Sequence, residues 1–283
     1  GGVDGVTGAN QFEARVAPDG TTLLLAPGAA ALAWLAGDPR THFDVARWVP
    51  VMTGITSGLV AGTIPLVPGR RARVAASGPV GPDMTALLAL EILGVEPVPV
   101  FTPGDPAAIR AAFAGGEIDL ALLRGEEIAT ALSGLAGSGV RPLFSLGVPT
   151  ADGTFARDPA FANLRQMTEV YRSLHRREPV GHLFQAWTAA AVAARLEFCL
   201  VLPELTPAAL IALWRQAGVQ AMRAPELQQT AAATQVRPLT GADAAATTTA
   251  LAPDAASLLE LRRWLATRLD WHPGPDIVRL TNP

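Results

Sequence analysis

The sequence predicts an α/β fold with mainly parallel sheets. Short apolar runs alternate with helical stretches over residues 74–146, a pattern typical of parallel strands joined by crossover helices. Many of the 27 glycines and 24 prolines lie between these runs, as expected where turns separate short elements. The chain has 283 residues, 49% of them hydrophobic, which is enough for two lobes with a large core.

The N-terminal segment begins with a helix and a strand joined by a tight turn. Phe12 and Val16 are apolar at helical spacing, and the helix stops before Pro18. Asp19-Gly20 supplies the turn, because glycine accepts a positive φ at little cost. Over this part we expect helices at 9–17 and 29–36 and strands at 21–26, 49–53 and 58–67.

The middle of the chain carries the alternation most clearly. We expect strands at 74–77, 98–101, 118–123 and 140–146, with helices from Pro82 or Asp83 to Leu93, at 106–114 and at 126–136. A parallel sheet gathers the loops after its strands at one edge, where open α/β sheets bind ligands. The loops concerned are 77–83, 102–105 and 124–126.

The C-terminal part ends in a predicted helix. The residues at 254–269 have an amphipathic pattern, so we expect a helix there. Residues 230–256 are rich in alanine and threonine. No repeat of solenoid length is present in the sequence.

Composition excludes several classes of function. The net charge is −3 with no block of like charge, so nucleic-acid binding is not expected. All 22 basic residues are arginines, which excludes Schiff-base and P-loop lysine chemistry. The single cysteine, Cys199, lies in an apolar run and is expected to be a buried, inert thiol. The uncharged stretch 48–69 holds three prolines and four glycines, so we expect strands and turns there and no insertion into a membrane.

The sequence shows no catalytic or metal-binding constellation, so neither an enzyme nor a cofactor is expected. The histidines His42, His175, His182 and His272 are scattered without a His-x-x-x-His pair. There is no Gly-x-Ser-x-Gly, and Gly78 and Gly81 do not form a dinucleotide-binding fingerprint. Glu126 and Glu127 are adjacent, and adjacent residues do not face each other on a helix.

Anion binding by backbone amides is the chemistry that remains. A helix N-terminus presents unpaired N–H groups and a partial positive charge, and the 77–83 loop precedes a predicted helix with Ser77 as an added hydroxyl donor. The alternative is that its glycines and prolines only form turns. Asp83 is either a helix N-cap or an inward-pointing carboxylate, which would repel an acid and favour a ligand with a hydroxyl or an amine.

Arg124 follows its strand at the same edge and could hold a carboxylate in a bidentate manner. An ion pair with Glu126 or Glu127 is an equally good interpretation. In the other half of the chain, the charge-free loop after residue 26 could offer backbone N–H groups. The candidate ligand-binding residues are Pro27, Gly28, Ala29, Ala30, Ser77, Gly78, Gly81, Asp83, Thr102, Gly104 and Arg124.

Several short motifs resemble one family in their order along the chain. They are Gly1-Gly2, Ala17-Pro18-Asp19-Gly20 before a Leu-rich strand, Val98-Pro99-Val100, Gly116-Glu117-Ile118-Asp119-Leu120 and Arg141-Pro142-Leu143. This order resembles the substrate-binding proteins of tripartite tricarboxylate transporters, the Bug family of bacterial periplasmic receptors. The resemblance covers nearly the whole chain. It also includes the segment after residue 195, which resembles the family's return strand at 196–203, its Thr206-Pro207 turn and a helix through Trp214.

The resemblance implies a two-lobed periplasmic-binding-protein-like fold of type II, the Venus-flytrap arrangement. It implies a first lobe from 1–73 plus 198–283 and a second lobe at 74–197. It also implies a periplasmic, monomeric receptor that takes a small organic carboxylate and passes it to membrane transporter subunits. The family's signal peptide, first strand and Pro-Gly-Gly loop would precede Gly1. We therefore expect the first lobe to be incomplete in this chain.

Two alternatives stay open at this stage. The absent N-terminal loop and the hydroxyl-poor Pro27–Ala31 loop favour a relative that acts as a sensor or protein-interaction module, or a fragment that binds nothing. An enzyme acting on a small acid is a third class, although the sequence shows no nucleophile–base pair for it.

Overall fold

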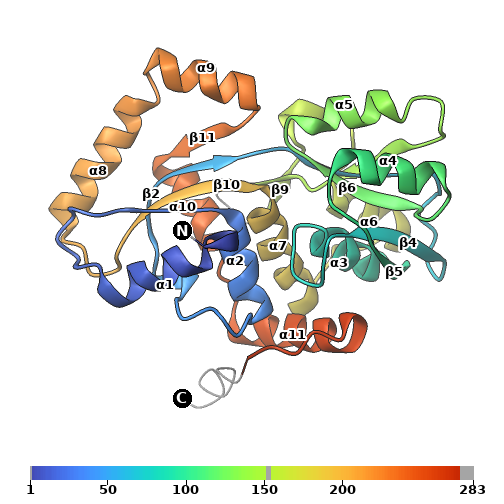
Figure 1. Cartoon of the computed structure of the whole chain (residues 1–283), viewed down its shortest axis with the longest axis horizontal. Coiled ribbons are helices and arrows are strands. Elements are labelled where there is room, and N and C mark those ends of the chain that lie inside the picture. The colour runs from blue at the N-terminus through green and yellow to red at the C-terminus, as the bar shows by residue number, and fades with distance from the viewer. Residues whose placement is uncertain (1, 151–153, 275–283) are drawn as a thin grey trace.

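Two separate β-sheets lie side by side in the computed structural model, which describes residues 2–150 and 154–274 (Figure 1). The first sheet has the strand order β1 (Leu24–Ala26), β10 (Leu196–Leu202), β2 (Val49–Ile55) and β11 (Arg237–Thr240). The second has the order β5 (Glu96–Phe101), β4 (Arg71–Ala76), β6 (Leu120–Arg124), β3 (Gly58–Gly62) and β7 (Arg141–Ser145). A small hairpin joins β8 (Val148–Pro149) to β9 (Phe155–Ala156).

The predicted α/β class with two lobes is confirmed, but the expectation of mainly parallel sheets is wrong. All the strand pairs of the first sheet are antiparallel. In the second sheet β4 pairs in parallel with β5 and β6, whereas β3 pairs antiparallel with β6 and β7. The alternation of strands and helices holds only around β4, β5 and β6. Elsewhere the strands are short and apolar, and such runs carry no sequence signal of their direction.

The chain passes between the sheets at two places. It leaves the first sheet after β2 and enters β3 through residues 56–57, and it returns where α7 (His182–Arg195) runs directly into β10. Strand β3, which we expected in the first lobe, therefore pairs within the second sheet. Strand pairing favours a lobe boundary near residue 56, and the limits expected from the sequence stay a prediction.

Local capping explains where several helices start and stop. Helix α2 (Gly28–Ala36) ends at Gly37, which has a φ of 68°. Helix α4 (Pro106–Ala114) begins with proline after Asp105, whose side chain accepts hydrogen bonds from the N–H groups of residues 107 and 108. Helix α6 (Met167–His175) begins with a reciprocal capping box between Gln166 and Glu169.

The main core lies around α7, which packs against helices of both lobes. Its neighbours are α2, α3 (Met84–Ile92) and α11 (Ala255–Leu269). Six of its alanines are buried, and small side chains let the neighbouring helices approach closely. Trp187 is fully buried in α7 and donates a hydrogen bond from Nε1 to the Thr85 carbonyl oxygen in α3 at 3.2 Å. One continuous core thus joins the two lobes on this side.

Smaller clusters cover the other faces of the sheets. Ile109, Phe113 and Ile128 bury the face of the second sheet under α4 and α5 (Glu127–Gly134). Helix α8 (Ala208–Ala221) packs on β2 over Val51 and Met52. The remaining helices are α1 (Val6–Arg15), α9 (Pro225–Thr234) and α10 (Gly241–Ala250), with 3-10 turns at Val3–Gly5, Val45–Arg47 and Pro159–Phe161.

Helices α5 and α9 lie on the opposite side of the molecule from α11 (Figure 1). They belong to different lobes. No helix among residues 2–150 and 154–274 has the length and apolar character needed to cross a bilayer. Gly1, one of the residues that carry the family resemblance, lies outside the described residues.

Candidate functional site

A cavity of about 580 Å³ lies between the two lobes on the side of α5 and α9. The second lobe contributes the turn 124–127 after β6, and the first lobe contributes Glu197 and Phe198 of β10. Helix α9 and strand β11 complete the lining with Leu227, Thr230, Ala231, Thr234, Val236 and Pro238. The volume falls in the usual range for pockets that hold small molecules.

A smaller cavity adjoins this interlobe cavity, and a third cavity adjoins that smaller one. The smaller one, of about 160 Å³, shares Arg124 and Glu127 with the interlobe cavity and is also lined by Ser77, Asp83 and Gly104. The parallel pairing of β5, β4 and β6 explains this meeting, because it brings the loops after the three strands to one edge. The third, of about 300 Å³, again includes Ser77 and reaches across to the first lobe.

The structure brings together some of the predicted site residues and separates others. Ala29, Ser77, Gly81, Asp83, Gly104 and Arg124 line one or more of the three cavities. Pro27, Gly28, Ala30, Gly78 and Thr102 line none of the three.

Packing accounts for the position of the first-lobe residues. Gly28 faces the junction of α7 and β10, where an added Cβ would lie 2.1 Å from the Ala193 carbonyl oxygen and 2.4 Å from that of Leu196. Ala30 is fully buried, and its N–H donates to the Pro27 carbonyl oxygen. This helix start therefore serves close packing, and of these four residues only Ala29 borders a cavity.

Both donors of Ser77 in the 77–83 loop are used within the loop. Asp83 Oδ2 accepts hydrogen bonds from the Ser77 N–H at 2.9 Å and from the Ser77 hydroxyl at 2.7 Å. The first amides of α3, from residue 84 to residue 86, donate to the carbonyl oxygens of residues 81 to 83. The expectation that Ser77 offers a free hydroxyl to an anion is therefore wrong, because Asp83 is the acceptor. Asp83 makes no capping hydrogen bond to its helix.

Arg124 pairs with a residue of the other lobe. Its Nη2 lies 3.2 Å from Oε1 of Glu197 in β10, so the partner is neither Glu126 nor Glu127. Burial lowers the pKa of the Arg124 guanidinium, while Glu197, Asp83 and Glu127 act in the opposite direction. Its Nε is buried without a hydrogen-bond partner among the described residues. The charge of Arg124 thus lies where the 580 Å³ cavity and the 160 Å³ cavity meet.

Thr56 lies where the chain crosses from β2 to β3 and borders the interlobe cavity. The residue is 2% exposed, and its Oγ1 has no hydrogen-bond partner among the described residues. A buried hydroxyl without a partner carries a cost of about 1–3 kcal/mol. It is therefore a place where a bound polar group would gain a hydrogen bond.

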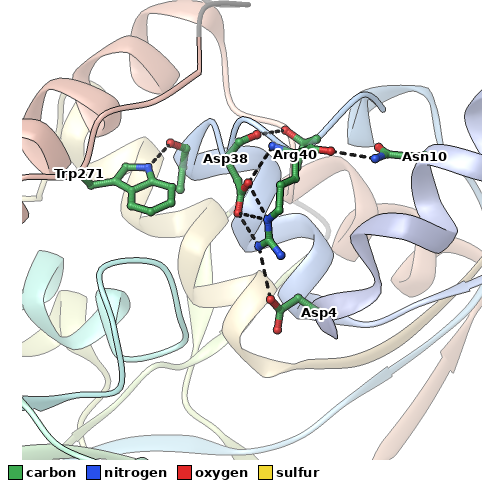
Figure 2. Close-up of polar contacts among 7 residues, drawn as sticks. Asp4, Asn10, Asp38, Arg40 and Trp271 are labelled. Carbon is green, nitrogen blue, oxygen red and sulfur yellow. Dashed lines mark hydrogen bonds and ion pairs between the residues drawn. The ribbon is translucent and has the colours of Figure 1, made fainter. Parts of the chain in front are cut away.

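A polar cluster borders the 300 Å³ cavity on the first-lobe side (Figure 2). Asp38 is 4% exposed and accepts hydrogen bonds from the backbone and guanidinium of Arg40. The guanidinium also approaches Asp4 at 3.6 Å. Hydrogen bonding to Arg40 lowers the pKa of Asp38. Both charges are satisfied within the cluster, which ties the N-terminal segment to the end of α2.

Sequence reasoning missed the first-lobe half of the interlobe cavity. Glu197 was read only as part of a return strand, and no helix was expected at 225–234. The sequence does hold one sign of this position, because the charged Glu197 lies directly before the apolar run 198–202. A strand that is buried on both faces does not contain a carboxylate, so Glu197 indicates that one face of this strand end is open. Helix α9 has no buried residue, so its sequence carries no amphipathic signal.

One trio of side chains has the residue types of a hydrolase triad but makes different hydrogen bonds. His182 Nδ1 lies 3.3 Å from Ser257 Oγ, and Asp254 is nearby. Ser257 is fully buried and its hydroxyl donates to Gln185. Asp254 accepts from the Ser257 N–H and caps α11. The trio is a helix start. Among the described residues, no group of His, Cys, Asp and Glu could hold a metal ion.

Solved structures resemble the chain over most of its length. A TctC solute binding protein from Polaromonas, solved with no ligand, is 14% identical with a TM-score of 0.63 and covers 95% of this chain and 85% of its own. A periplasmic transporter is 18% identical with a TM-score of 0.50, covering 94% of this chain and 82% of its own. The chain has the fold of periplasmic solute-binding proteins.

A third structure with this fold is an R. palustris protein with adipate. It is 13% identical to this chain with a TM-score of 0.50 and covers 95% of this chain and 84% of its own. No known family profile matches the sequence, and no curated protein matches it. Solute-binding proteins are thus among the structural relatives of this chain.

Proposed function

We propose that the chain is a periplasmic solute-binding protein that captures a small organic acid between its lobes. The single observation that carries the proposal is the 580 Å³ interlobe cavity, which is lined from both lobes and holds Arg124. In this proposal the acid is delivered to membrane subunits of a tripartite tricarboxylate-type transporter, and the receptor acts as a monomer.

The chemistry of the cavity supports binding without reaction. An arginine side chain suits a carboxylate, and the hydroxyl of Thr56 and the ring of Phe198 can contact the rest of a small molecule. The R. palustris relative was solved with adipate, which is an organic acid of suitable size. The 77–83 loop supports the proposal less than its sequence does, because Asp83 occupies the donors of Ser77.

Titration calorimetry of the purified chain against small organic acids tests the proposal. The panel contains dicarboxylates, tricarboxylates, aromatic acids and amino acids. We expect saturable binding with a Kd near about 1 μM, which corresponds to about −8 kcal/mol. The absence of saturable binding to every member would contradict the proposal.

A matched pair of variants locates the site. Ala231→Phe places a ring into the lining of the interlobe cavity, whereas Ala232→Phe adds the same ring at the next, exposed position of α9. We expect Ala231→Phe to weaken binding by about tenfold or more, because the ring takes space that the ligand needs. Ala232→Phe should bind as the unmodified chain does. Equal binding by both variants would place the site elsewhere.

A further inference from the structure

The interlobe cavity is acidic. Its charged lining residues are one arginine, Arg124, and three glutamates, Glu126, Glu127 and Glu197. The adjoining 160 Å³ cavity adds Asp83 beside the same arginine. The chain has no lysine in its sequence that could shift this balance. A ligand in the cavity therefore meets more negative than positive charge.

Arg124, the one cation that lines the cavity among residues 2–150 and 154–274, already has carboxylate neighbours. Arg124 pairs with Glu197 at 3.2 Å, and Asp83 and Glu127 act on its charge as well. A dicarboxylate that placed one end on Arg124 would bring its second end close to the glutamates. Like charges in a partly buried site repel more strongly than in water. A second negative charge on the ligand is thus disfavoured.

Two further features of the lining point to a bound positive group. Thr56 is 2% exposed and its hydroxyl, without a partner among residues 2–150 and 154–274, can accept a hydrogen bond. Phe198 offers an aromatic ring in the same cavity, and an ammonium group is attracted to the face of such a ring. An ammonium group supplies the donors and the charge that this lining lacks.

We infer that the ligand is a small ampholyte, with one carboxylate directed to Arg124 and one ammonium group among Glu126, Glu127 and Glu197. The inference rests on the proposed function and narrows its substrate class. The sequence-based expectation is a carboxylate held by loop amides and by Arg124, and the acidic lining adds an ammonium group to that ligand. The glutamates then select for charge, and the apolar part of α9 and β11 surrounds the carbon chain.

Matched compounds of equal length separate the effect of charge from that of size. The six-carbon series is adipate, 6-aminohexanoate and hexane-1,6-diamine, and the four-carbon series is succinate, 4-aminobutanoate and butane-1,4-diamine. Calorimetry at low salt measures each Kd. We expect the amino acid of at least one series to bind about tenfold or more tighter than both of its matched partners.

Variants test whether the glutamates cause the preference. The double variant Glu126→Gln, Glu127→Gln removes two of the negative charges. We expect it to reduce the ratio of amino-acid affinity to dicarboxylate affinity by about tenfold. Both residues are exposed at the start of α5, so the fold tolerates the change. Glu117→Gln, an exposed position outside the cavity in the same lobe, is the control and should leave the ratio unchanged.

The outcomes separate this inference from the proposed function. Dicarboxylates that bind as tightly as the amino acids would overturn the ampholyte and leave acid capture standing. Diamines that bind most tightly would also overturn it, since Arg124 would then have no role. A ratio that the double variant leaves unchanged would overturn the assignment to the glutamates. No binding by any compound of the two series or of the wider acid panel would overturn both proposals.

Discussion

Gly28 is a residue whose close packing is visible only in the structure. The sequence suggests an amide donor in a ligand loop, and the structure places Gly28 against the backbone of α7 and β10. The absence of a side chain, and not a free N–H, is what the position requires. A glycine at a helix start is compatible with both roles, so the sequence alone cannot separate them.

Gly28→Ala should destabilise the protein strongly. The added Cβ would lie 2.1 Å from one backbone carbonyl oxygen, and backbone cannot move aside as a flexible side chain can. We expect a loss of about 3 kcal/mol or more in the free energy of unfolding, measured by urea denaturation. Gly8→Ala is the matched control in α1, where nothing lies within 4 Å of the new Cβ. It should stabilise by up to about 1 kcal/mol, and a similar loss in both variants would refute the packing account.

Asp38→Asn tests the polar cluster of Figure 2 through its pH dependence. Hydrogen bonding to Arg40 lowers the pKa of Asp38 below its ordinary value of 3.8, so the folded state favours the ionised form. The stability that this provides is complete above pH 3.8 and is lost as the pH falls through the lower folded-state value. At pH 7 the variant should lose about 1–3 kcal/mol.

A comparison of the unmodified chain with Asp38→Asn at lower pH completes this test. The difference in unfolding free energy between them should shrink as the pH is lowered below 3.8. Asp243→Asn, at an exposed position in α10, should show no such change. A difference that stays constant from neutral to acidic pH would contradict a role for the ionised carboxylate.

At the scale of elements, the crossing between the lobes is held by a buried ion pair. Arg195, the last residue of α7, contacts Asp158 at 2.9 Å, and both side chains are 4% exposed. Its guanidinium also donates to the carbonyl oxygens of Thr56 and Gly147. Burial lowers the pKa of Arg195 to about 10, which shows how far the charge is removed from water. These contacts hold the two places where the chain crosses between the sheets, at residue 56 and at residue 195, against the hairpin of β8 and β9.

Asp158→Asn should therefore be costly. It leaves the guanidinium of Arg195 buried without its counter-charge, and we expect a loss of about 3–5 kcal/mol in the free energy of unfolding. Glu96→Gln removes one partner of an exposed pair with Arg71 and should cost less than about 1 kcal/mol. Chemical denaturation of both variants is the measurement. A loss at Asp158 no larger than that at Glu96 would show that the pair does not hold the crossing.

Most elements could be predicted from the sequence where turn chemistry and periodicity agree. Helix α4 begins at Pro106 after its Asp105 cap as expected, and α2 ends at Gly37 as expected. The direction of the strands could not be predicted. Strand β3 begins only two residues after β2 ends, and its short apolar sequence does not indicate whether its neighbours run parallel or antiparallel to it. Strand β11 was missed altogether, since it lies in an alanine- and threonine-rich segment without alternation.

The candidate site also has a part that the sequence predicts and a part that it does not. The meeting of the loops after β4, β5 and β6 follows from local pattern, and the structure places Ser77, Gly104 and Arg124 around one cavity. The pairing of Arg124 with Glu197 joins residues far apart in the chain, and no local pattern encodes it. Of the predicted site residues, the sequence therefore places only Arg124 in the interlobe cavity, and the first-lobe wall of that cavity comes from the structure.

For the whole molecule, the continuous core around α7 joins the two lobes on one side. The interlobe cavity of about 580 Å³ lies beside α5 and α9, and the smaller cavity between the lobes, of about 300 Å³, lies beside α2. Figure 1 shows α5 and α9 on the opposite side of the molecule from α11. The same lobe pairing brings acidic residues from both lobes around one arginine. Fold, cavity and charge are consistent with capture of a small charged solute without chemical conversion.

A crystal structure of the chain with the tightest-binding compound of the acid panel tests this claim most directly. The account predicts ligand density between residues 124–127 and helix α9, with a carboxylate group on the side of Arg124. Density at any other place on the protein, with this interlobe cavity free of ligand, would contradict it.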